Sequence, residues 1–205
     1  MTARTPKPSL TRPTEQQISS AAAPRRAMRL RLERRASPIG VILLVADESG
    51  ALRALDFDDY EARMAELLRR HYGAYLLAEG GAPKLATSAL EAYFDGDLNA
   101  LANVPTATGG STFQREIWAA LRKIPPAATI SYGQLAASLG RPGASRAVGL
   151  ANGANPIGIV VPCHRVIGSN GALTGYGGGL HRKRWLLDHE RRHAGASQDQ
   201  GRLAI

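Results

Sequence analysis

The sequence predicts a protein of mixed helix and strand, α/β (α+β) in class, with two domains. Short apolar runs and apolar–polar alternation between residues 28 and 57 are typical of strands. After residue 110, apolar residues recur mainly at helical spacing. Gly109-Gly110 separates the two patterns. We therefore expect a small N-terminal domain of sheet and helices, followed by a mostly helical C-terminal domain with a helix-turn-helix.

The expected N-terminal domain, residues 28–109, follows a segment without periodicity. Residues 1–27 mix Thr, Pro, Ser, Ala and Arg, which predicts a disordered basic tail. Strands are then expected at 28–32, 41–46 and 52–57. Helices are expected at 60–71 and 85–94. Nothing in this half indicates catalysis.

Two helices of the expected C-terminal domain, residues 110–193, begin with a capping box. Ser111 stands three residues before Gln114, and Ser131 stands three residues before Gln134. In this arrangement the two side chains satisfy free backbone amides at the start of a helix. We therefore place one helix from Ser111 to the prolines at 125–126 and a shorter one from Ser131.

A tight turn and a small-residue helix follow. Gly140-Arg141-Pro142-Gly143 ends the preceding helix, and residues 144–153 form the next one. Helix, tight turn and helix give the outline of a helix-turn-helix, although small side chains can read few base edges. A flexible tail at 194–205 is expected to end the chain.

Charge is distributed unevenly along the 205 residues, whose net charge is +9. Residues 1–35 carry nine Lys and Arg against two acidic residues, residues 36–109 five against eleven, and residues 110–205 twelve against four. The basic C-terminal part suits a polyanion such as DNA. Basic charge alone predicts only non-specific binding that weakens with salt.

Neither a membrane segment nor a metal site is indicated. No apolar run approaches the ~18 residues that span a bilayer, and the N-terminus lacks the apolar centre of a secretory signal. We therefore expect an intracellular protein with no membrane partner, and the style of the sequence suggests the bacterial cytoplasm. One cysteine excludes an internal disulfide and a cysteine-based zinc site, and the five histidines show no ligand spacing. We expect no metal and no cofactor.

The residues around Cys163 carry the chemical information. The apolar run 157–161 and Pro162 precede it, His164 follows it, and a glycine-rich segment occupies 171–179. This pattern predicts a thiol at the end of an extended segment, beneath a flexible loop. A lone cysteine is more often a small buried hydrophobe. A chemical role needs a thiolate, which His164 and nearby arginines could favour.

An ordered set of motifs extends from residue 113 to residue 190. They are Phe113-Gln114, Ile124-Pro125, Ser131-Tyr132-Gly133-Gln134-Leu135-Ala136, Ser145-Arg146-Ala147-Val148-Gly149, Asn155-Pro156, Val161-Pro162-Cys163-His164-Arg165-Val166-Ile167, Gly175-Tyr176-Gly177-Gly178-Gly179 and Lys183-Arg184-Trp185-Leu186-Leu187 with Glu190. This set resembles the O6-alkylguanine-DNA alkyltransferase family (methylated-DNA–protein-cysteine methyltransferases), strongly over 110–193 and loosely over 28–109. The family usually has glycine where Ala127 stands, a departure expected to alter a turn without touching the chemistry.

The resemblance implies DNA repair by direct, single-turnover transfer of the alkyl group from O6-alkylguanine to Cys163. His164 would draw off the thiol proton through a water, with Glu190 orienting the imidazole. Tyr132 would donate to a ring nitrogen of the departing guanine. On local evidence alone, Glu190 lies on a charge-rich helix and is better explained as a solvated surface acid.

The same resemblance implies how DNA is held. The partner is double-stranded DNA containing O6-alkylguanine, and the target base must be flipped out of the stack. Arg146 fills the vacated space, and further contacts come from Ser131, Ala147 and Ala151. The hinge and base pocket are formed by Asn155, Val166, Tyr176, Gly177 and Gly178. We expect a monomer, with cooperative binding to DNA left open.

Other functions stay open on the residues themselves. A non-enzymatic protein that senses alkyl lesions would keep the pocket, but its cysteine would be replaced. A Cys-His-Glu thiol hydrolase would turn over repeatedly on acyl substrates, which neither the small-residue helix nor the basic C-terminal half supports. A transcription regulator is the weakest of these alternatives.

Overall fold

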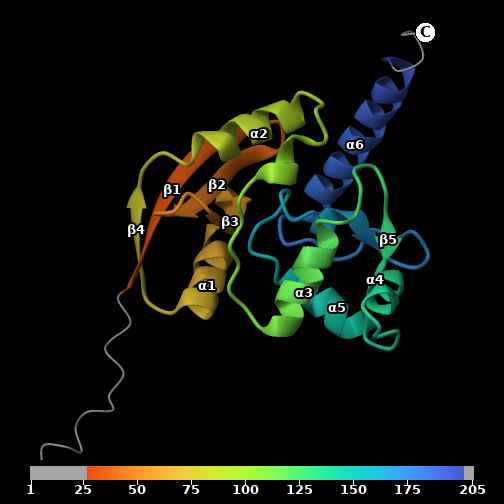
Figure 1. Ribbon diagram of the computed structural model, residues 1–205, viewed down its shortest axis with the longest axis horizontal. Coiled ribbons are helices and arrows are strands. Elements are labelled where there is room, and N and C mark those ends of the chain that lie inside the picture. The colour runs from red at the N-terminus through yellow and green to blue at the C-terminus, as the bar shows by residue number, and fades with distance from the viewer. Residues whose placement is uncertain (1–26, 201–205) are drawn as a thin grey trace, which may run out of the picture.

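The computed structural model describes residues 27–200 of the chain, with side chains described as far as residue 194 (Figure 1). The expected basic tail at 1–27 therefore lies outside the described residues, apart from Ala27. Sheet and helices fill the first half and helices dominate the second, which confirms the predicted α+β class (Figure 1). No helix within residues 27–200 has both the length and the apolar character needed to cross a membrane.

A four-stranded sheet forms the framework of the N-terminal half. Its strands are β1 (Met28–Ser37), β2 (Gly40–Asp47), β3 (Leu52–Phe57) and β4 (Tyr75–Glu79), in the order β3-β2-β1-β4. The first three pair antiparallel, and β4 joins β1 in parallel. The sequence analysis missed β4. This edge strand leaves Leu76 and Leu77 exposed, so it has no buried face to mark it in the sequence.

Helices cover both faces of this sheet. Helix α1 (Glu61–Tyr72) packs on one face and α2 (Lys84–Phe94) on the other (Figure 1). Strand β2 lies between the two layers, so its apolar residues form an unbroken run instead of alternating with polar ones. Both helices begin and end within one residue of the predicted bounds.

The C-terminal half contains four helices and a two-stranded parallel sheet. The helices are α3 (Thr112–Leu121), α4 (Tyr132–Ser138), α5 (Ser145–Gly153) and α6 (Leu180–Gln200), and the strands are β5 (Ile130–Ser131) and β6 (Val166–Ile167). Both predicted capping boxes form, at Ser111 and at Ser131. Helices α4 and α5 adopt the expected helix-turn-helix outline.

The tail expected at 194–205 begins inside a helix, because α6 continues to Gln200. Its last turns contain Ala194, Gln198 and Gln200, and Gly195 is the only glycine among them. Alanine and glutamine favour helix, and one glycine lowers helix stability without ending the helix. Residues 201–205 lie outside the described part of the chain.

The main hydrophobic core is continuous between the two halves. It includes Leu55 and Phe57 of β3 together with Trp118 of α3 and Cys163 itself. The backbone continues the link, since Leu55 N donates to Pro156 O (2.9 Å) and Gly158 N donates to Leu55 O (2.9 Å). The segment that leads to Cys163 is thus hydrogen-bonded to the N-terminal sheet.

Candidate active site

Cys163 begins a short 3-10 helix, Cys163–Arg165 (η4), instead of ending an extended segment as the sequence predicted. The chain before it is a series of turns in which Val161 N donates to Ile157 O (3.0 Å). Asn155 organises these turns: its Oδ1 accepts from Ile157 N (3.0 Å) and its Nδ2 donates to Val161 O (2.8 Å). Hydrogen bonds from the Asn155 side-chain amide replace the backbone pairing that a strand would have. The apolar run 157–161 gives no sign of this in the sequence.

The thiol of Cys163 is neutral in this environment. The residue is 5% exposed, and burial raises the pKa of its thiol. The Asn155 side chain and the positive charges of Arg63 and Lys183 act in the opposite direction without overcoming burial. Cations therefore lie near the sulfur, as the sequence analysis expected, but they do not make the resting cysteine a thiolate.

His164 is fully buried, with Nε2 2.9 Å from Glu190 Oε1. Burial lowers the pKa of His164, so the imidazole is neutral. Because a carboxylate can only accept, the ring proton lies on Nε2 and the Nδ1 lone pair stays open. Nδ1 has no hydrogen-bond partner among the described residues. A neutral imidazole with an open ring nitrogen can take up a proton.

Glu190 lies in the interior and not on the surface that its charged helix indicated. It accepts hydrogen bonds from Tyr93 Oη (3.0 Å), Ala127 N (2.9 Å) and Arg165 Nη2 (2.8 Å) in addition to His164. Burial by itself raises the pKa of Glu190, but the hydrogen bonds and charges of His164 and Arg165 outweigh it and hold that pKa well below its usual range. The carboxylate is therefore ionised.

A glycine-rich loop, 175–179, lies beside the thiol. Tyr132 Oη donates to Thr174 O (3.1 Å) at its start. The Tyr176 ring meets the His164 ring edge-on, with centroids 6.5 Å apart, and its hydroxyl is buried with no partner among the described residues. Lys183 Nζ donates to Val166 O (2.6 Å) and Thr174 O (2.7 Å), and burial lowers the pKa of this lysine to about 8.

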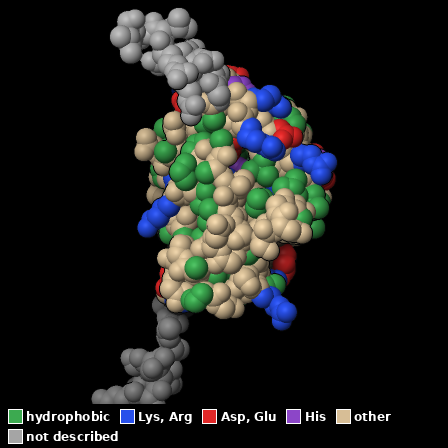
Figure 2. Space-filling model, turned by 90° about the vertical axis from the view of Figure 1, so that its right-hand side faces the viewer, with side chains coloured by type: hydrophobic (Ala, Val, Ile, Leu, Met, Phe, Trp, Pro, Cys, Tyr) green, Lys and Arg blue, Asp and Glu red, His purple; other side chains and the backbone are tan. Residues whose placement is uncertain are grey.

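The exposed face of helix α5 carries one charged side chain, Arg146, among uncharged residues. Arg146 and Ala147 are exposed, and Leu150 is 73% exposed. Tyr132, Arg146 and Leu150 line an open pocket of about 530 Å³ between α4 and α5. Figure 2 shows this side of the molecule: at the height of α4 and α5 the surface is mainly backbone and uncharged side chains, with Lys and Arg towards its edges.

Ala151 is not on that face. It is 3% exposed, and its carbonyl accepts from Trp118 Nε1 (2.9 Å). Ala151 was expected among the DNA-binding residues, but it lies three residues after the buried Val148 and shares its inward face, so its side chain is turned away from the exposed face of α5. Ser131 is half-buried, and its hydroxyl caps α4.

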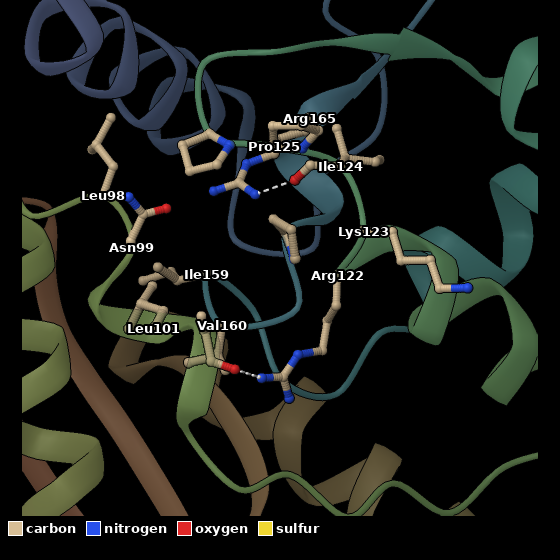
Figure 3. Close-up of a pocket in the computed structure, with 13 residues that line it drawn as sticks. Leu98, Asn99, Leu101, Arg122, Lys123, Ile124, Pro125, Ile159, Val160 and Arg165 are labelled. Atoms are coloured by element: carbon tan, nitrogen blue, oxygen red, sulfur yellow. Dashed lines mark hydrogen bonds between the residues drawn. The ribbon is translucent and has the colours of Figure 1, made fainter. Parts of the chain in front are cut away.

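A second pocket, of about 180 Å³, lies behind the cysteine, between the 3-10 helix Ala100–Asn103, the end of α3 and residues 159–162 (Figure 3). Arg165 donates from Nη1 to Ile124 O (2.6 Å) within it. Arg122 donates to carbonyls along its rim, and Lys123 points away (Figure 3). Arg165 lines this pocket, and no residue of α5 does.

Comparison with known proteins matches both halves of the chain to one family. Residues 32–108 match the ribonuclease-like domain of 6-O-methylguanine DNA methyltransferase, and residues 112–192 match its DNA binding domain. The methylated-DNA--protein-cysteine methyltransferase of Salmonella typhimurium is 54% identical over 165 residues, which cover 80% of this chain and 96% of that protein. The chain belongs to the 6-O-methylguanine DNA methyltransferase family.

Other members of this methyltransferase family agree in sequence and in fold. The methylated-DNA--protein-cysteine methyltransferase of Mycobacterium tuberculosis H37Rv is 46% identical over 160 residues, 78% of this chain and 92% of that protein. The crystal structure of Mycobacterium tuberculosis OGT in complex with DNA is similar, with a TM-score of 0.67 and 41% identity over 80% of this chain and 94% of that chain.

In this methyltransferase, the residues singled out from the sequence fall into two groups. One is a mostly buried cluster around the thiol, made up of Cys163, His164, Glu190, Asn155, Val166, Tyr176, Gly177 and Gly178. The other lies on or near the α4–α5 surface and consists of Tyr132, Ser131, Arg146 and Ala147. The function of each residue stays a prediction.

Several residues around the thiol and Glu190 were not predicted from the sequence, Tyr93 among them. Two cations lie near the Cys163 thiol, those of Arg63 and Lys183. Arg165 pairs with the Glu190 carboxylate. Arg165 and Lys183 lie inside the motifs quoted for the family, so their motifs carried a signal. Ala127 adopts a left-handed backbone (φ 62°) and donates its N–H to Glu190, so the departure from glycine touches the candidate site. Arg63 had no local signal.

Proposed function

We propose that this methyltransferase repairs O6-alkylguanine in double-stranded DNA by transferring the alkyl group to Cys163, once per molecule. The observation that carries the proposal is the buried pair His164–Glu190, in which a neutral imidazole next to Cys163 in the chain is hydrogen-bonded to an ionised carboxylate and keeps Nδ1 open. Such an arrangement can deprotonate the sulfur when the substrate is bound. We place its action in the bacterial cytoplasm, where the DNA substrate lies.

Transfer is a displacement at carbon. The thiol proton passes through a water to His164 Nδ1, and Glu190 stabilises the resulting imidazolium. The sulfur then bonds to the alkyl carbon, the bond from carbon to O6 breaks, and its electron pair stays with guanine. In the structure Tyr132 Oη donates to Thr174 O. When the base binds, a guanine ring nitrogen replaces that acceptor and the developing negative charge is stabilised.

The product explains why each molecule acts once. A thioether is a stable bond, and Cys163 is the only cysteine of the chain, so no second thiol can displace the alkyl group. The enzyme is thereby consumed in stoichiometric amounts.

The α5 face supplies the DNA contacts in this proposal. The modified base leaves the stack to reach the buried sulfur. Arg146 is exposed, and no hydrogen bond or ion pair joins it to another described residue, so its side chain is free to enter the vacated space. Small residues beside it allow the backbone to approach DNA closely, independently of sequence.

Intact mass spectrometry tests this function. Wild-type protein mixed with an equimolar duplex containing one O6-methylguanine is expected to gain the mass of one methylene group and to stop at one equivalent. Cys163→Ala is expected to bind the same duplex without a change in mass. Tight binding by the wild type without a mass gain would indicate a lesion sensor, and neither binding nor mass gain would redirect the search to acyl substrates.

A further inference from the structure

Arg63 links the N-terminal sheet to the active site. It lies on α1, and its Nη1 donates to Asp56, a residue of β3 that is 3% exposed. Its Nη2 donates to Gly153 O (2.8 Å) and to Asn155 O (3.1 Å). One planar guanidinium thus joins a buried carboxylate to two backbone carbonyls of the C-terminal half.

Those two carbonyls occupy a sensitive position. Gly153 is the last residue of α5, where the carbonyls of a helix lack partners and the helix dipole is negative. Asn155 is the residue whose side chain organises the turns before Cys163. A cation at this point stabilises the end of the DNA-facing helix and fixes the start of the cysteine segment.

The glycine-rich loop packs on the same guanidinium. A Cβ placed on Gly177 would overlap the Arg63 guanidinium, so glycine at this position allows the loop to lie directly against it. Arg63 therefore contacts α5, the Asn155 turn and the 175–179 loop at once.

Asp56 keeps Arg63 in place. Burial raises the pKa of Asp56, and Arg63 counteracts that rise as the nearest opposite charge. If Arg63 swung away, a buried carboxylate would lose its partner, which is strongly unfavourable. The guanidinium is consequently held at one site.

Several charged groups face the thiol from different elements. Arg63 of α1 and Lys183 of α6 favour its ionised form. Tyr176 of the loop and the hydrogen-bonded group of His164, Glu190 and Arg165 complete the surroundings. Arg63 is the only one of these residues that the N-terminal half contributes.

We propose that Arg63 is a positioning residue for alkyl transfer, which holds the end of α5, the Asn155 turn and the 175–179 loop in one arrangement and stabilises the thiolate of Cys163. The N-terminal domain then takes part in the reaction through this residue. The proposal about alkyl transfer rests on the proposed function, whereas the effect on the thiol can be measured without DNA.

The first test follows the alkylation of the thiol by iodoacetamide as a function of pH. Cys163 is the only thiol, so labelling reports on it alone. In Arg63→Met the midpoint is expected to move about one pH unit higher, because a positive charge beside the sulfur is lost. Arg63→Lys is expected to keep the wild-type midpoint. Arg34→Met, which breaks an exposed pair with Glu61 near the same helix, is the matched control and is expected to change nothing.

A double variant guards against misfolding. Arg63→Met leaves Asp56 unpaired in the core, so Asp56→Asn is combined with it to remove both buried charges together. The combined variant is expected to show the same higher midpoint as Arg63→Met. A folded double variant with the wild-type midpoint would overturn the thiolate part of the proposal.

The second test separates positioning from charge. Arg63→Lys keeps a cation but loses the planar fork, so its transfer rate from O6-methylguanine duplex is expected to fall between about tenfold and a hundredfold. Its rate with the free O6-methylguanine base, which does not use α5, is expected to fall less. Equal rates for Arg63→Lys and wild type on duplex would overturn the positioning role. If the wild type itself accepted no methyl group, the proposed function would fail. The iodoacetamide comparison would still test whether Arg63 stabilises the thiolate of Cys163.

Discussion

Burial and one charged carboxylate together set the protonation of the candidate active site. Glu190 accepts from Tyr93, Ala127, His164 and Arg165, and these donors keep it ionised in the interior. The charged carboxylate fixes the His164 tautomer and leaves Nδ1 open. Burial keeps the pKa of His164 low and the ring neutral before the reaction, and the positive charge of Arg165 acts in the same direction against the pull of the carboxylate. An unprotonated base is thus available beside a thiol that burial keeps protonated.

Replacing Glu190 tests this balance at the residue scale. Glu190→Gln is expected to lower the free energy of unfolding at pH 7 by about 3–5 kcal/mol, because Arg165 is left as an unpaired buried cation. The pKa of Glu190 is lower in the folded than in the unfolded state, so its stabilisation is fully present above the unfolded pKa of about 4.3 and is lost progressively as the pH falls from there towards the much lower folded pKa. Urea unfolding at pH 7 and pH 3 should therefore show a difference between wild type and variant that is about 2 kcal/mol smaller at pH 3.

Glu66→Gln provides the control for this experiment. Glu66 pairs with Arg69 and Arg70 on an exposed face of α1, where an ion pair contributes little. It is expected to change stability by less than about 1 kcal/mol at either pH. A Glu190→Gln penalty that is the same at pH 7 and pH 3 would contradict the assigned ionisation.

Helix α5 illustrates how one element serves two purposes. Val148, Ala151 and Asn152 face the core, and Ala151 is held by Trp118. Arg146 and Leu150 lie one turn apart on the opposite side and are both exposed. The helix thereby carries a cation and an apolar side chain on the face proposed for DNA, anchored from behind by the core.

These two side chains should affect DNA binding differently. Arg146→Ala is expected to reduce the slope of log K against log salt concentration by about 0.9, because one fewer counterion is released from DNA. Leu150→Ala is expected to weaken binding without changing that slope, since only apolar contact is lost. Anisotropy of a labelled duplex across a salt series measures both. Arg70→Ala on α1 serves as the control, and an unchanged slope for Arg146→Ala would argue against its contact with DNA.

Across the whole molecule, the two halves share one hydrophobic core. Leu55 of β3 is 1% exposed, packs in the same core as Trp118, and exchanges backbone hydrogen bonds with residues 156 and 158. A core without a break is expected to unfold as one cooperative unit. The N-terminal sheet then contributes to the stability of the active site as well as to its geometry.

Tryptophan fluorescence can detect this coupling, because both tryptophans, Trp118 and Trp185, lie in the C-terminal half. Leu55→Ala removes buried apolar volume from the N-terminal sheet and is expected to cost about 2–5 kcal/mol. The urea midpoint followed by tryptophan fluorescence should fall together with the midpoint followed by circular dichroism. A fluorescence midpoint that stays at the wild-type value would show that the halves unfold independently.

Much of the fold was predictable because its signals are local. The alternation in β1, the apolar run of β2, the two capping boxes and the glycine-containing turn before α5 each depend on residues close together in the chain. Motif order likewise identified Cys163, His164 and Glu190. Strand β4 was not predicted, because an exposed edge strand has no buried face and so no alternation of apolar and polar residues.

Only the tertiary structure decided the electrostatics of the site and its supporting contacts. Local sequence placed Glu190 on a solvated helix, and the family resemblance placed Ala151 at the DNA surface, yet both are buried once α6 and α5 pack against the core. Arg63 reaches carbonyls about ninety residues further along the chain, a separation that no local pattern encodes. The sequence by itself determined which groups are present and which helices carry them. Burial and charge pairing, which set the protonation of the thiol, imidazole and carboxylate, arise only when distant segments are brought together.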